Sequence, residues 1–149
     1  MQMTDASPFA RKSWMATLAK ASPARLAGLF PDLPAHTVLR HPEIGAVMVR
    51  GRIGGTGSAF NLGEMTVTRA SVRLASGEVG HAWVQGRDKD HALRAAAVDA
   101  LMQTDRAADL TASLLRPLAA ESGAARDLRA AKAAATKVDF FTMVRGEDK

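Results

Sequence analysis

The sequence contains no cysteine and no tyrosine, and only 5% of its residues are aromatic. Without cysteine, the chain supplies no disulfide, no thiol nucleophile and no thiolate ligand for an iron–sulfur cluster. Two tryptophans and five phenylalanines are too few and too scattered for the stacked aromatic platform of a nucleic-acid-binding protein. The composition therefore argues against cluster chemistry in this chain and against nucleic acid as its partner.

Long apolar runs are missing as well. No stretch reaches the roughly 18 to 20 apolar residues that span a bilayer, and the opening segment lacks the apolar block of a signal peptide. We therefore expect a soluble, cytoplasmic protein with no membrane partner. The histidines do not fall at metal-ligand spacing on one element, so we expect no metal site.

The chain has 149 residues, of which 47% are hydrophobic, and this suits one domain with a modest core. Its formal net charge is +5, and residues 50–94 carry seven Lys and Arg against four acids. Such a surplus favours an anionic ligand or an acidic partner protein. A solubilising surface is the alternative interpretation of the charge.

The apolar pattern predicts one α+β domain over residues 1–149. Residues 1–34 show helical spacing, with Trp14 and Leu18 four residues apart. Residues 36–86 are rich in Val, Ile and Thr and predict an antiparallel sheet of about four strands.

A second helical zone follows the sheet. Residues 88–137 form a helical segment that Asp88 caps, and Pro117 is expected to end or kink a helix there. Residues 138–149 are predicted to form an extended tail. Helices therefore flank the sheet on both sides in the sequence.

Side-chain alternation gives the first candidate site. Arg50 and Arg52 oppose an apolar row in one strand, and Arg69 and Arg73 oppose another row in the next. If both apolar rows face the helices, the four guanidinium groups gather on the outer side of the sheet. Such a patch calls for an anion or an acidic partner. Scattered arginines on a solvated face are the alternative.

Met65 and Val67 have the opposite parity to the apolar row that begins at Ala70. Either the strand is bulged near Thr68, or both of its faces are covered, in which case Met65 and Val67 meet a partner chain. Without a bulge, Glu64 points inward and is the best candidate for a functional acid. A salt-bridged structural glutamate is the alternative interpretation.

Five glycines punctuate the segment between the arginines. It matches neither phosphate-loop template, because no Lys follows these glycines and no helix follows Gly57. Backbone N–H groups in such a loop can still cup an anion, so Gly54, Gly55, Thr56 and Gly57 are candidate contacts, with a plain turn as the alternative. Arg87 and Lys89 are further candidates, because they begin a helix whose free N–H groups favour anions.

Four blocks of this sequence together resemble one known family. The resemblance runs from about Arg11 to Gly146, and its blocks are RKSWMATLA, MVRGRIGGTGSAFNLGEMTVTRASVRL, WVQGRDKDHA and VDFFTMVRG. They are similar to the PhnG subunit family of the bacterial carbon–phosphorus lyase system. The segments between the blocks match only loosely.

The resemblance implies a role inside a multi-subunit complex. PhnG-type proteins work with the H, I and J subunits and an ATPase-like L subunit in phosphonate catabolism. With the H, I and L subunits they support the formation of ribose 1-phosphonate 5-triphosphate from ATP and an alkylphosphonate, with release of adenine. The resemblance implies an accessory subunit that holds no cofactor of its own, with ATP as a substrate of the complex, and it supplies no catalytic residue.

Two roles remain open within that complex. The chain is either a purely structural assembly subunit or a contributor of residues to a composite active site. The tail is a candidate for docking on a partner subunit, through Phe140, Phe141, Met143 and Val144. Packing of the tail on the chain's own sheet is the alternative.

Overall fold

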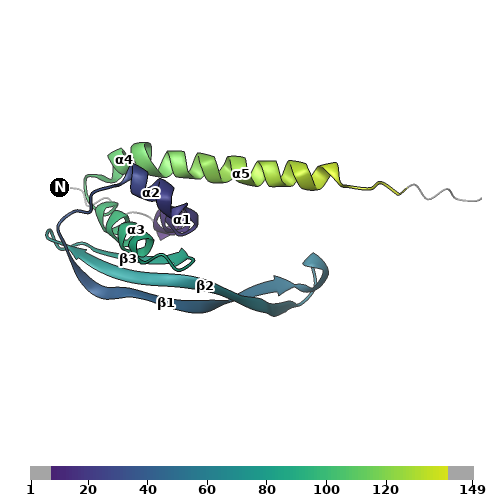
Figure 1. The fold of residues 1–149 in the computed structure, drawn as a ribbon, viewed down its shortest axis with the longest axis horizontal. Helices are drawn as coiled ribbons and strands as arrows, with labels where there is room; N and C mark the ends of the chain where they lie inside the picture. Colours follow the sequence, from purple (N-terminus) through teal and green to yellow (C-terminus); the bar gives the residue numbers. More distant parts are fainter. Residues whose placement is uncertain (1–7, 141–149) are drawn as a thin grey trace, which may run out of the picture.

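The computed structural model describes residues 8–140 and has two layers, a sheet and a set of helices that lie on one side of it (Figure 1). The antiparallel sheet has the strand order β1–β2–β3, with β1 (His36–Arg52), β2 (Ala59–Leu74) and β3 (Val79–Gln85). The helices are α1 (Pro8–Lys20), α2 (Pro23–Leu29), α3 (Lys89–Leu101), α4 (Ala107–Leu110) and α5 (Arg116–Ala135). A short 3₁₀ turn η1 (Ile53–Gly55) lies between β1 and β2, and a π-helical segment η2 (Thr111–Leu115) lies between α4 and α5. The predicted α+β class is confirmed.

The sheet has three strands in the described residues, whereas about four were predicted. The difference lies in β1, which bends at irregularities between Val38 and Arg40 and between Arg40 and Glu43 but does not end. Pro42 falls in the second irregularity, on an edge strand where a missing N–H is tolerated. Proline often interrupts a strand, but here β1 accommodates it as a bulge.

The core lies between α3 and the face of β2 and β3 that is turned toward it. Val72 and Val84 are fully buried there against an alanine-rich helix. Small side chains let the helix approach the sheet so closely that a Cβ on Gly80 would lie 1.9 Å from the carbonyl oxygen of Ala96. Further buried side chains come from the other helices: Trp14, Leu18, Leu26, Leu110, Leu114 and Leu118.

Of the two outcomes predicted for Pro117, an end or a kink, the structure excludes the end. This proline is the second residue of α5, and the π-helical segment η2 comes directly before it. Proline lacks an N–H and its ring crowds the carbonyl oxygen four residues earlier. A widened turn relieves this crowding, so the chain remains helical from α4 to the end of α5.

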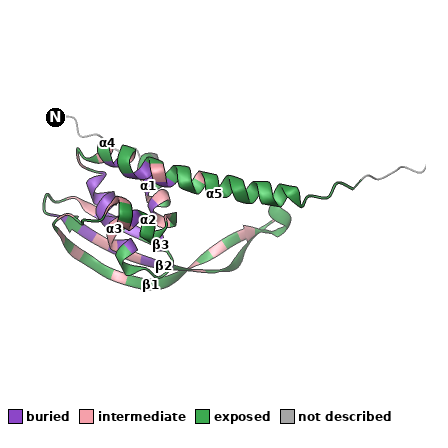
Figure 2. Ribbon diagram, turned by 45° about the horizontal axis from the view of Figure 1, so that its top comes forward, coloured by how far each residue is buried: buried purple, intermediate pink, exposed green. Residues whose placement is uncertain are grey.

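The β1–β2 hairpin extends well beyond β3 and the helix α3, and we call residues 46–66 the arm (Figure 1). None of its residues is buried, and only Val47, Val49, Gly51, Gly57 and Met65 are half-buried (Figure 2). The distal part of α5 projects in the same direction and is exposed almost throughout. A two-stranded ribbon is at best marginally stable alone in water and is usually supported by a third strand or a packed helix. The arm has neither support within the described residues.

Candidate functional site

The structure does not bring the four predicted arginines together. Arg50 and Arg52 lie at the tip of the arm, where they pair with Asn61 and Ala59, whereas Arg69 and Arg73 pair with Glu43 and Thr37 at the base of the sheet. Eight residues separate Asn61 from Arg69 along β2, which corresponds to about 26 Å of strand. The predicted single patch of guanidinium groups is therefore wrong.

The two pairs of arginines also differ in parity along the strands, and a register shift between Val49 and Arg50 separates them. The pairing is uninterrupted from Glu43–Arg69 to Val49–Gly63, so odd-numbered residues of both strands share one face there. We call this the outer face, because it is turned away from α3, and Arg69 and Arg73 lie on it. Arg50 and Arg52 have the other parity. The prediction assumed that the apolar row of β1 faces the helices, but much of this row lies in the arm, beyond them.

Arg69 is already neutralised within the chain. Its guanidinium group lies 2.9 Å from a carboxylate oxygen of Glu43, which also accepts a hydrogen bond of 3.2 Å from Arg40. The hydrogen bond from Arg69 lowers the pKa of the Glu43 carboxyl group below its ordinary value. The same guanidinium group lies 5.4 Å from the ring centre of Trp83, at cation–π distance. Sequence reasoning missed Glu43, because only the register shows that it faces Arg69.

The glycine-rich segment forms the turn at the tip of the arm. Gly54 and Gly55 have positive φ values of 60° and 84°, which glycine adopts without strain. The backbone N–H groups of Thr56 and Gly57 both point at the carbonyl oxygen of Ile53. Two of the donors that an anion would need are therefore used inside the turn, and this geometry favours the plain-turn alternative.

Arg87 and Lys89 are exposed at the start of α3, as the sequence indicates. Asp88 caps this helix by accepting a hydrogen bond of 2.8 Å from the backbone N–H of His91, and Asp90 lies in the first turn. Two carboxylates thus already complement the helix dipole. The positive end of this helix is therefore already offset within the chain, which weakens the case for an anion at Arg87 and Lys89.

Glu64 does not point into the core. It keeps the parity of the buried row, since no bulge separates it from Thr68, but it lies in the arm opposite Met48 and is exposed. The packed core does not reach this position, so the inward-facing carboxylate predicted from alternation is wrong.

Met65 and Val67 lie on the outer face, with no bulge in β2 near Thr68. Val67 is only 7% exposed and Met65 is half-buried, although no described helix packs on this face. Of the tail candidates, Phe140 is 88% exposed, so it does not pack on the sheet. Phe141, Met143 and Val144 lie outside the described residues.

The structure also contains a buried polar site that the sequence did not reveal. Asp99 is fully buried in α3, and its carboxylate accepts hydrogen bonds from Arg11, from the indole N–H of Trp14 and from the backbone N–H of His81, at 2.7 to 3.1 Å. It thereby ties α1 and β3 to α3. A single acid in an otherwise alanine-rich helix face was the one available signal.

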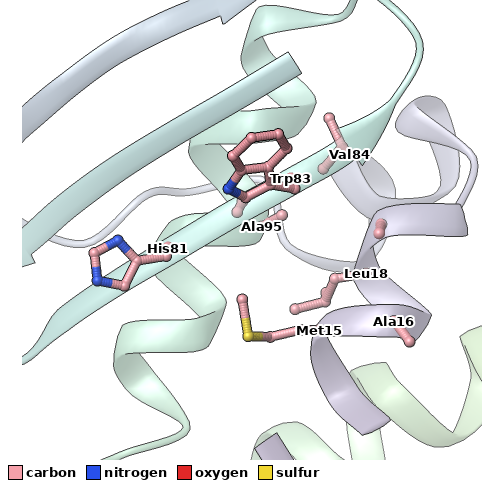
Figure 3. Close-up of a pocket in the computed structure, with 9 residues that line it drawn as sticks. Met15, Ala16, Leu18, His81, Trp83, Val84 and Ala95 are labelled. Atoms are coloured by element: carbon pink, nitrogen blue, oxygen red, sulfur yellow. The ribbon is translucent and has the colours of Figure 1, made fainter. Parts of the chain in front are cut away.

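Two hollows adjoin Trp83. One, of about 220 Å³, lies between α1 and the edge of β3, and Figure 3 shows Met15, Leu18 and His81 around it. The other, of about 250 Å³, is lined on the outer face by Glu43, Gly45, Val67 and Arg69. Trp83 itself is 49% exposed. Both hollows are open and small, and neither gathers a set of catalytic groups.

The part of the chain that the structure describes, residues 8–140, holds no group of three or more side chains that could together bind a metal ion. None of its helices combines the length and apolar character needed to cross a membrane.

Comparison with known proteins shows what the chain is related to. Residues 9–146 match the family model described as phosphonate metabolism protein PhnG. A curated protein of Rhizobium meliloti (strain 1021), the alpha-D-ribose 1-methylphosphonate 5-triphosphate synthase subunit PhnG, is 47% identical over 147 residues, which cover 97% of this chain and 94% of that protein. The resemblance found in the four sequence blocks is confirmed, and the chain belongs to the PhnG family of phosphonate metabolism proteins.

Proposed function

We propose that this chain is a subunit of an alpha-D-ribose 1-methylphosphonate 5-triphosphate synthase and serves it as a required accessory subunit. The observation that carries this proposal is the 47% identity, over nearly the full length of both chains, to a protein with that name. In the proposed reaction an alkylphosphonate displaces adenine from ATP, and the products are adenine and ribose 1-phosphonate 5-triphosphate.

The proposed partners are the H, I and J subunits and the ATPase-like L subunit of the carbon–phosphorus lyase system, in a hetero-oligomer that works in the cytoplasm. ATP enters as a substrate of the complex, and this chain holds no cofactor of its own. The unsupported arm and the exposed distal half of α5 support a role in assembly, because both are surfaces that gain stability when another chain covers them.

The second candidate role is a contribution to a composite active site, in which Arg52 or Arg87 grips the triphosphate. Both side chains are exposed, and Arg52 donates a hydrogen bond of 3.2 Å to the carbonyl oxygen of Gly57. Arg69 is less suited to this role, since Glu43 already neutralises it. We therefore favour the assembly role.

Reconstitution tests the proposal. A complex of the other subunits is assayed for adenine release from ATP and methylphosphonate, with and without this chain. We expect activity only when the chain is present, and unchanged kcat and KM for ATP with Arg52→Ala. Full activity without the chain would refute the accessory role. A KM for ATP raised at least tenfold by Arg52→Ala would favour the composite site instead.

A further inference from the structure

The outer face changes in character from the base of the sheet to the arm. At the base its cross-strand rows are polar or charged. They are Thr37–Arg73–Val79, Arg40–Ser71–His81 and Glu43–Arg69–Trp83. Toward the arm the rows become apolar. They are Gly45–Val67–Gln85, Val47–Met65 and Val49–Gly63, in which Gln85 is the one polar side chain. An apolar area bordered by charged residues is the usual composition of a protein–protein interface.

No described helix covers this face, because α1 to α5 all lie on the other side of the sheet (Figure 1). The exposed indole of Trp83 stands at the boundary between the charged and the apolar rows. The hollow of about 250 Å³ beside it lies over Gly45, which has no side chain to fill it. This space has room for one apolar side chain of a partner.

The Trp83 indole is held in place before any partner arrives. Glu43 fixes the guanidinium group of Arg69 through contacts of 2.9 and 3.1 Å, and that group lies 5.4 Å from the indole ring centre. A side chain that is ordered in advance loses little entropy on binding. Trp and Arg are also the residues most often found at the energetic centre of an interface.

The charge of this face indicates the chemistry of its partner. The base of the outer face carries three positive charges and one negative charge, a net excess of two positive charges. The positive charges belong to Arg40, Arg69 and Arg73, and the negative charge to Glu43. Within the described residues, Arg73 forms no ion pair or side-chain hydrogen bond, and its side chain is exposed. A partner that presents carboxylates opposite Arg73 complements this charge.

We propose that the outer face is the docking surface for another subunit of the synthase, which places an apolar side chain in the hollow beside Trp83 and acidic groups opposite Arg73. This inference rests on the proposed function and adds the face, the anchor residue and the charge of the partner surface. It commits to a different subunit as the occupant, and not to a second copy of this chain.

The test uses the full chain and the remaining subunits, co-expressed and then titrated as purified components. We expect Trp83→Ala to weaken binding about 30-fold or more, as at interface centres. Arg73→Glu should weaken it about 10-fold and make the affinity less sensitive to salt. The matched controls are Leu33→Ala and Lys12→Glu, exposed residues outside the outer face, which should stay within about twofold of wild type. Circular dichroism melts identify any variant that does not fold.

Each result separates this inference from the function on which it rests. If the wild-type chain binds no other subunit, the proposed function fails. If the wild-type chain binds, but Trp83→Ala and Arg73→Glu bind as tightly as wild type, the proposed function stands and the inference about the docking face is refuted. Tighter binding by Arg73→Glu would mean a basic partner surface and would also overturn the inference. So would a self-association that Trp83→Ala abolishes, because the occupant would then be a second copy. If Trp83→Ala does not fold, the result for the exposed Arg73→Glu decides.

Discussion

At the scale of single residues, Gly80 sets the distance between α3 and the sheet. A Cβ at this position would lie 1.9 Å from the carbonyl oxygen of Ala96 and 2.6 Å from the backbone nitrogen of Ala100. Both contacts are with helix backbone, which cannot turn aside as a side chain can. We expect Gly80→Ala to lower the free energy of unfolding by about 3 kcal/mol or more, measured by urea denaturation.

Gly123 provides the matched control, because it lies in α5 and a Cβ there would meet nothing within 4 Å. Gly123→Ala should raise the free energy of unfolding by roughly 0.5 to 1 kcal/mol, since alanine restricts the unfolded chain and favours helix. Equal stabilities for the two variants would mean that α3 does not pack as closely on β3 as described.

The ion pair of Glu43 with Arg69 gives a prediction about pH. Because the pKa of Glu43 is lowered in the folded chain, its carboxylate stabilises the fold above its unfolded pKa, and this contribution is lost as the pH falls through the folded value. We expect Arg69→Gln to return the pKa of Glu43 toward its ordinary value, measured by NMR titration of the carboxyl carbon. Arg73→Gln removes an equal charge from the same face and should leave that pKa nearly unchanged.

The residue scale also shows what could be predicted from the sequence. Composition and alternation correctly identified the buried row that contains Val72, because its hydrophobic period is local information. Pairing between strands is not local. A register that sets Glu43 beside Arg69, and bulges that bend β1, depend on how β1 and β2 meet. The prediction of one arginine patch was wrong for this reason. The buried site at Asp99 was not predicted, because its hydrogen-bond partners come from α1 and β3.

At the scale of elements, the arm is the part of the fold with the least packing against the rest of the chain. Val47 and Met65 pair directly, so the residues between them can be replaced by a two-residue Asn-Gly turn without shifting the register below. None of the deleted residues is buried. We expect the shortened chain to keep its free energy of unfolding within about 1 kcal/mol of wild type.

The same shortened chain should lose co-purification with the other subunits of the complex, because the arm's apolar side chains have no role within this chain. Exposed Met48 and Leu62 are among the groups lost. A control chain that keeps the arm's length, with Ser58→Ala at the tip, should co-purify normally. A shortened chain that is unfolded when isolated would mean that the arm stabilises the domain, contrary to its exposure.

At this scale the sequence predicted that strands and helices are present, but it did not predict the residues at which they begin and end. The turn between β2 and β3 has a local cause, because Ser76-Gly77 is a common turn dipeptide and Gly77 has a positive φ of 110°. The effect of each proline depended on the surrounding structure. Pro42 lies in a bulge of β1, and Pro117 follows a π-helical segment, because the neighbouring residues accommodate each ring.

At the scale of the whole molecule, all helices lie on one side of the sheet, and the arm and α5 both extend past the packed core (Figure 1). The chain thus has one well-packed end, held together by α3 and the carboxylate of Asp99, and one end with little packing of its own. This division fits a protein whose folding and whose assembly use different residues. The two properties should then be separable by truncation.

The segment that follows α5 tests this separation. Val138 is 65% exposed and Phe140 is 88% exposed, so neither residue gains from burial within the chain. A chain that ends at Lys137 should therefore unfold at the same urea concentration as wild type, yet lose co-purification with the I subunit. Phe140→Ala in the full chain is the finer variant, because it removes one exposed aromatic ring and leaves the rest of the tail in place. Normal co-purification of the truncated chain would show that assembly does not need the tail, and the outer face and the arm would then have to account for it.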